Sequence, residues 1–237
     1  MHSRTFRLFQ PTDTHSCSYL NDRDARSTYV DPGEELDQQS LTLLSLNGFR
    51  RSGRLLYRPD CPGCSACQSV RLRLSDFKAS RNQRRILRRN QDLRLSVAKP
   101  MQAEAGCYAL FERYINTRHA DGDMYPASRE QFADFLLSDF GTSRFLLAHR
   151  DGELVACMVF DLLLDGVSSV YCFYAPEEEK RSLGTFMILC LNQLAQGLLL
   201  PYNYLGYYVE GSRKMDYKAN FSPLEAWNGH QWRPQSE

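Results

Sequence analysis

Three cysteines in the N-terminal third have a spacing that could hold a metal. Cys61, Cys64 and Cys67 follow one another at two-residue gaps. Thiolates spaced in this way can converge on one zinc ion or on one iron–sulfur cluster. A fourth ligand could come from Cys17 or His15. The sequence therefore predicts a zinc or iron–sulfur site on Cys17, Cys61, Cys64 and Cys67, and the alternative is a tight turn with reduced thiols.

A basic segment follows the cysteines. Residues 71–94 contain nine basic and two acidic side chains, so this segment carries +7 and the remainder −6, for a total of +1. Most of the basic residues are arginine, whose planar guanidinium suits phosphate oxygens. The segment indicates a polyanion-binding surface, with nucleic acid as the candidate ligand and a solvated helix face as the alternative. The arginines of the helix predicted here are Arg81, Arg84, Arg85, Arg88 and Arg89.

The rest of the sequence shows no arrangement typical of a nucleophilic triad. Tyrosines are dense near the C-terminus, and on an open strand they could stack on the base of a terminal adenosine. They are Tyr202, Tyr204, Tyr207, Tyr208 and Tyr217.

The composition is that of a folded protein. The chain has 237 residues, of which 43% are hydrophobic and 24% charged, and this balance excludes a disordered chain. No apolar run approaches the ~18 residues of a membrane span, and the N-terminus lacks an apolar signal core. We therefore expect a cytoplasmic protein without a membrane partner, whose eight cysteines are reduced or bind metal.

Hydrophobic periodicity predicts the elements that position these residues. In the N-terminal third it indicates a helix over Asp37–Asn47, strands over Leu55–Tyr57 and Val70–Leu74, and a helix over Arg81–Asn90 that begins after Ser80. From Leu93 onward the predicted order is β-α-α-β-β-β-α-β. Those elements are a strand at 93–97, helices at 103–118 and 129–139, strands at 144–150, 153–164 and 167–175, a helix at 181–197 and a strand at 202–209.

This order matches the topology of the GCN5-related N-acetyltransferases. The predicted fold is mixed α/β, with a smaller, basic, cysteine-containing domain at 1–90 and an acetyltransferase-like domain at 91–237. In that fold, ligands bind where two adjacent parallel strands separate, here Val167–Ala175 and Tyr202–Val209. The coenzyme A signature is incomplete, because Phe186 replaces a small residue after Arg181 and Gly184 and is expected to obstruct a pyrophosphate.

Longer motifs resemble the aminoacyl-tRNA–protein transferases, and most closely the bacterial branch that transfers leucine. The resemblance runs from about Cys17 to Glu225, with one departure at Ala175, where the family often has aspartate. The motifs are Cys17-Ser18-Tyr19-Leu20, Gly48-Phe49-Arg50-Arg51-Ser52-Gly53, Tyr57-Arg58-Pro59, Ser80-Arg81-Asn82-Gln83-Arg84-Arg85, His119-Ala120-Asp121-Gly122, Val170-Tyr171-Cys172-Phe173-Tyr174, Arg181-Ser182-Leu183-Gly184, Tyr204-Leu205-Gly206-Tyr207 and Met215-Asp216-Tyr217-Lys218-Ala219-Asn220-Phe221.

The resemblance implies a reaction and a set of roles. Leucine would pass from leucyl-tRNA to the α-amine of a protein that begins with Asp or Glu, which would mark that protein for degradation. The transfer itself would need no cofactor, since the ester is already activated. The five arginines of the basic helix would hold tRNA phosphates. Cations for the acceptor carboxylate would come from Arg50, Arg51, Arg181 or Lys218. Tyr171, Tyr174, Arg181 and Tyr207 would form the catalytic centre.

Two other hypotheses stay open at this level. One is an N-acetyltransferase that uses acetyl-CoA, and the other is a non-catalytic metal or RNA-binding sensor organised by the cysteines.

Overall fold

Most of the chain folds around one large sheet. The computed structural model describes residues 4–122, 124–138, 140–212 and 214–235. The eight strands lie in the order β14-β13-β7-β12-β11-β10-β9-β8. Their bounds are β7 Gln68–Arg73, β8 Arg94–Ala98, β9 Ser143–Arg150, β10 Glu153–Leu162, β11 Gly166–Tyr174, β12 Tyr202–Tyr208, β13 Leu224–Trp227 and β14 Trp232–Pro234.

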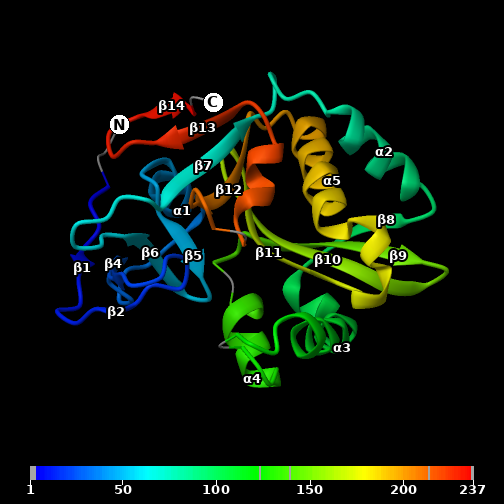
Figure 1. Ribbon diagram of the computed structural model, residues 1–237, viewed down its shortest axis with the longest axis horizontal. Coiled ribbons are helices and arrows are strands. Elements are labelled where there is room, and N and C mark those ends of the chain that lie inside the picture. Colours follow the sequence, from blue (N-terminus) through cyan, green and yellow to red (C-terminus); the bar gives the residue numbers. More distant parts are fainter. Residues whose placement is uncertain (1–3, 123, 139, 213, 236–237) are drawn as a thin grey trace.

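Helices cover both faces of this sheet (Figure 1). Helix α3 (Pro100–Arg118) packs on one face, and α5 (Leu183–Gly197) packs on the other together with α2 (Arg81–Arg89). The core between these layers is rich in aromatic residues, because large apolar side chains gain most from leaving water. Its fully buried phenylalanines are Phe111, Phe132, Phe145, Phe160, Phe173 and Phe221.

The topology confirms the acetyltransferase-like prediction. Strands β8 to β11 run antiparallel to their neighbours, α5 then crosses over the sheet, and β12 returns parallel to β11. The tight β9–β10 connection passes through Asp151 at φ 50° and Gly152 at φ 90°, the left-handed conformations that an Asp-Gly hairpin adopts. The elements predicted from Leu93 onward are therefore present, whereas β13 and β14 were not predicted.

One predicted helix differs in its form. A short α4 (Arg129–Phe132) begins after Ser128 and continues as a π-helical turn, η1 (Ala133–Leu137). Residue 139, the predicted end of this helix, lies outside the described residues. The turn buries Leu136 and leaves Phe135 partly buried, and Phe135 reaches the ring of Tyr171 with a centroid distance of 5.1 Å. The irregular segment thus brings an aromatic ring to β11.

A small sheet forms the N-terminal unit. Its strands lie in the order β1-β4-β6-β5, and a two-stranded β2–β3 pair and helix α1 accompany it. The bounds are β1 Leu8–Phe9, β2 His15–Ser16, β3 Asp24–Ala25, β4 Ser27–Val30, α1 Gln38–Leu46, β5 Arg50–Ser52 and β6 Leu55–Pro59. Helix α1 begins at Asp37, whose carboxylate accepts the Ser40 N–H at 2.8 Å.

The small and the large sheet do not divide the chain at residue 90, and the predicted domain boundary there stays a prediction. Strand β7 lies inside the large sheet, between β12 and β13, and α2 packs on α5. Val70 and Leu72 of β7 are completely buried there. An alternating strand with one apolar face fits either sheet, so its sequence did not indicate which one it joins. The N-terminal unit therefore ends near Pro59, and residues 68–89 belong to the main body. The described residues include no helix long and apolar enough to cross a membrane.

Candidate functional site

The candidate site lies where β11 and β12 separate. The two strands pair only from Gly166 to Ser168 and from Tyr202 to Tyr204. A cavity of about 1100 Å³ lies against both strands beyond that point. Its lining includes Val170, Tyr171 and Cys172 of β11 and Leu205 and Tyr207 of β12. A separation of parallel strands opens a binding space in the middle of an otherwise closed sheet.

Arg50 enters this gap from β5 of the small sheet. Its Nη2 donates to the Val170 carbonyl at 2.7 Å, and its guanidinium lies directly over Gly206. A Cβ on residue 206 would come within 1.4 Å of Arg50 Nη1, and Gly206 has φ +81°, so only glycine fits. Arg50 Nη1 is buried and has no hydrogen-bond partner among the described residues.

Lys218 brings a second cation to the same place. It lies in the 3-10 segment η3 (Asp216–Asn220), and only 3% of it is exposed. Its Nζ donates to the carbonyl of Tyr207 and lies 3.4 Å from the sulfur of Met215. Burial, together with the charge of Arg50, lowers the pKa of Lys218 to about 6. No ion pair to a carboxylate is found for Arg50 or Lys218 within the described part of the chain.

The three predicted tyrosines line the cavity but differ in their surroundings. The Tyr207 hydroxyl lies 3.1 Å from the Gly48 carbonyl and 2.9 Å from the Tyr57 carbonyl, so it ties β12 to the N-terminal unit. The ring of Tyr174 packs on Tyr114 with a centroid distance of 4.9 Å. Burial raises the pKa of Tyr171 and of Tyr207 above the usual value for tyrosine. The phenols of Tyr171 and Tyr207 therefore stay neutral near pH 7.

A histidine lies at the far end of the same cavity. The Nε2 of His119 is 3.2 Å from the Tyr114 hydroxyl, and burial lowers the pKa of His119. His119, which the sequence singled out without a role, therefore stays neutral near pH 7 and extends the polar lining past Tyr174. Tyr114 itself was missed, because its helical spacing indicates only a buried residue of α3.

Arg51 belongs to the framework rather than to the cavity's binding groups. It is 4% exposed and uses all five of its N–H groups within the protein. It pairs with Asp161 at 2.7 and 3.1 Å. Its other donations go to the Gly53 and Ser138 carbonyls and to the Ser143 hydroxyl. We therefore correct the prediction that Arg51 binds the acceptor, since it has no donor left for a substrate.

Arg181 is also a structural residue. It pairs with Asp92 at 2.8 Å and with Glu178 at 2.8 Å, and it does not line the cavity. These bonds join the 3-10 segment η2 (Pro176–Arg181) to the loop between α2 and β8. The predicted catalytic role of Arg181 is therefore corrected to a positioning role for η2, which precedes the start of α5.

The residues of the coenzyme A-like signature also lie differently from the prediction. Phe186 is 4% exposed and packs into the core, so it cannot obstruct a ligand. Gly184 and Thr185 do line the cavity, at the start of α5. Ala175, at the end of β11, is 1% exposed and points into the core. The departure from aspartate at 175 therefore removes no group from the cavity.

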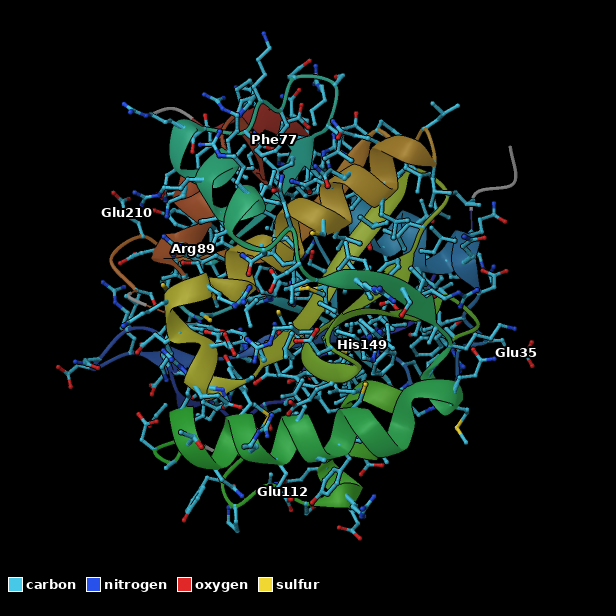
Figure 2. All side chains as sticks on the ribbon, turned by 90° about the vertical axis from the view of Figure 1, so that its right-hand side faces the viewer. Glu35, Phe77, Arg89, Glu112, His149 and Glu210 are labelled. Carbon is cyan, nitrogen blue, oxygen red and sulfur yellow. The ribbon has the colours of Figure 1, made fainter. Side chains whose placement is uncertain are left out.

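The predicted arginine helix is present and exposed. Ser80 and Gln83 form a reciprocal cap at the start of α2, while Gln83 and Ile86 face the protein. Arg81, Arg84, Arg85, Arg88 and Arg89 are all exposed on the other side. Arg89, labelled in Figure 2, donates to the Lys180 carbonyl of η2, so the end of this basic surface meets the segment that leads to the cavity.

The four predicted cysteine ligands are free, half-buried thiols. Burial, followed by the charges of Cys61, Cys17 and Cys64, raises the pKa of Cys67 to about 11, so the four thiols lie near enough to influence one another. In the described part of the chain, no group of three His, Cys, Asp or Glu residues is arranged to hold a metal ion. The zinc or iron–sulfur site therefore stays a prediction.

The strand order and the gap between β11 and β12 define an acetyltransferase-like fold. Models of the arginine-tRNA-protein transferase family match residues 15–85 with their N-terminal part and residues 106–228 with their C-terminal part. The chain belongs to this family, and it is an aminoacyltransferase.

Similar proteins agree with this assignment. A protein of Marinobacter nauticus named aspartate/glutamate leucyltransferase is 47% identical over 229 residues, which are 97% of this chain and 96% of that protein. A protein of the same name from Chromohalobacter salexigens is 47% identical over 235 residues, 98% and 94% of the two chains. A solved structure of unknown function from Bacteroides thetaiotaomicron is 14% identical and has a TM-score of 0.50, covering 65% of this chain and 54% of that one.

Proposed function

We propose that the protein transfers leucine from leucyl-tRNA to the α-amine of proteins that begin with Asp or Glu, and so creates a signal for their degradation. The names of its relatives support the reaction, and the cavity supports the donor. One observation favours leucine over arginine as the amino acid of the donor tRNA. The wall of the cavity is apolar and is formed by Met158, Val170, Ile188 and Leu205.

An arginyl donor would require a buried carboxylate. The described carboxylates that line the cavity are Asp121 and Glu179, and both are exposed at its edge. Glu179 also lies 3.3 Å from Arg118, its partner on α3. A guanidinium against the apolar wall would lose water without gaining a partner, whereas a leucyl side chain gains from the same burial.

The chemistry needs alignment more than a nucleophile. Leucine is esterified to the 3′ end of the tRNA, so a neutral α-amine can attack the ester carbon directly. The usual pKa of such an amine, about 7.7–8.0, leaves part of it neutral at physiological pH. The C–N bond forms, an oxyanion develops, and the C–O bond to the ribose then breaks. The hydroxyls of Tyr171 and Tyr174, which line the cavity, would supply donors beside the ester and its oxyanion.

The donor tRNA approaches over α2. Arginines 81, 84, 85 and 88 stand on an exposed helix face, and Arg89 connects that face to η2, directly before α5 and the cavity. Phosphates of the acceptor stem would bind these arginines while the terminal adenosine and its ester enter the gap between β11 and β12. Because the proposed donor is a charged tRNA, we expect the reaction to take place in the cytoplasm.

The test offers the protein labelled leucyl-tRNA and four peptides that differ only in an N-terminal Asp, Glu, Asn or Ala. Label should appear on the Asp and Glu peptides. Arginyl-tRNA and acetyl-CoA serve as competing donors and should give no product. Acetylation of the peptides would favour the N-acetyltransferase hypothesis, and transfer of arginine in place of leucine would refute the assignment of the donor.

A further inference from the structure

Two basic side chains, Arg50 and Lys218, lie at one place in the cavity without a carboxylate partner among the described residues. The Arg50 guanidinium covers Gly206, and the Lys218 Nζ is bound to the carbonyl of the next residue, Tyr207. Buried cations in proteins are nearly always paired with an anion, because an unpaired charge in a low-dielectric site is costly. The buried arginines of this protein obey the rule, such as Arg51 with Asp161 and Arg71 with Glu225. The Arg50 guanidinium has no such partner among the described residues, and an anionic ligand in the cavity would supply one.

We propose that Arg50 and Lys218 form the subsite for the side-chain carboxylate of the acceptor's first residue. This inference rests on the proposed function, and it selects two of the four cations that the sequence offered. Arg51 and Arg181 are excluded because their donors already face Asp161, Asp92 and Glu178.

The geometry suits a carboxylate. Arg50 Nη2 donates to the Val170 carbonyl, which fixes the plane of the guanidinium, and Nη1 lies against Gly206 without a partner among the described residues. Arg50 and Lys218 both line the cavity, so a carboxylate bound there would face the guanidinium and the amine together. An amide, as in Asn or Gln, offers only one acceptor oxygen and no charge, so the site should reject it. The subsite thus selects the side-chain chemistry of the acceptor.

Occupation of the subsite also changes the charge of Lys218. Without a ligand, burial and Arg50 hold its pKa at about 6, so it is mostly neutral at pH 7. A bound carboxylate favours the ammonium, and acceptor binding therefore takes up a proton. The other titratable groups nearby are Tyr57, Tyr207, Tyr217 and Cys172; burial raises the pKa of each, so they stay neutral near pH 7.

The experiment measures dissociation constants of an Asp peptide and of its Asn twin, together with leucine transfer to each. The variants are Lys218→Met and Arg50→Lys, and Lys99→Met is the matched control, an exposed lysine at the start of α3. Wild type should bind the Asp peptide more tightly, and Lys218→Met should reduce this preference about 10- to 100-fold, the loss of one charge-assisted hydrogen bond. Arg50→Lys keeps the charge and should retain part of the preference.

A pH series separates this role from a structural one. The wild-type preference for Asp over Asn should fall as pH rises above about 6, by at most tenfold per pH unit, because Lys218 must gain a proton. Lys218→Met should show a preference independent of pH, since both peptides carry the same titrating α-amine. Thermal melting verifies that each variant is folded.

The outcomes separate the two proposals. Equal wild-type binding of the Asp and Asn peptides, or full preference in folded Lys218→Met, overturns the subsite whatever the transfer assay shows. Selective binding without leucine transfer supports the subsite and refutes the proposed reaction alone.

Discussion

Replacing Arg51 tests whether this residue stabilises the fold or binds the acceptor substrate. In Arg51→Met, the carboxylate of Asp161 stays 2% exposed and loses both of its bonds to the guanidinium, at 2.7 and 3.1 Å. Among the partners described for it, the hydroxyls of Ser143 at 2.7 Å and Thr142 at 3.5 Å remain. Removing one partner of a buried ion pair costs about 3–5 kcal/mol.

That cost should be visible in a thermal melt. For a chain of this length, 1 kcal/mol corresponds to about 2–4 °C in Tm, so Arg51→Met should melt roughly 6–20 °C below wild type. The double variant Arg51→Met/Asp161→Leu removes both charges and should recover most of the loss. At a temperature where it remains folded, Arg51→Met should keep the wild-type KM for an Asp peptide. An unchanged Tm with an acceptor KM raised tenfold or more would refute this reasoning and place Arg51 in the substrate site.

Four other predictions concern single side chains. Gly206→Ala should reduce transfer at least tenfold, as its Cβ displaces Arg50; wild-type kinetics would contradict this close approach. Arg84→Ala or Arg88→Ala should raise the KM for leucyl-tRNA. Each should also reduce, by about 1, the slope of the logarithm of tRNA affinity against the logarithm of salt concentration between 50 and 200 mM. An unchanged slope would show that α2 does not bind the tRNA. Arg181→Met should lower stability by about 1 kcal/mol in urea unfolding, with turnover within twofold of wild type; lost turnover in the folded variant would restore the catalytic role. Burial lowers the pKa of Lys218 from its usual 10.5 to about 6, so between these pH values the unfolded state binds one proton more than the folded state. The stability of wild type relative to Lys218→Met should therefore rise with pH across this range. A constant difference in Tm between the two proteins would contradict a buried neutral amine.

Local chemistry predicted much of the fold. The signals for the helix start after Ser80 and for the strands at 144–150 and 153–164 are short-range, and each gave the right element. The assignment of β7 to the large sheet depends on pairing with β12 and β13, which lie more than a hundred residues further along the chain. No local pattern records such a partner, so the sequence did not predict which sheet β7 would join.

The site shows the same limit at the scale of one residue. Arg50 and Arg51 are neighbours in one motif on one short strand, so their side chains point to opposite sides. The sequence predicts that alternation but not which side holds Asp161 and which holds the gap between β11 and β12. In the same way, Arg181 could not be recognised as paired until the fold brought Asp92 beside it.

The central claim is tested most directly by one comparison of products. The protein is given labelled leucyl-tRNA and an equal mixture of an Asp peptide and its Asn twin, and the products are identified by mass. The account predicts leucine on the α-amine of the Asp peptide and almost none on the Asn peptide. Equal labelling of both peptides, or leucine on neither, would contradict it.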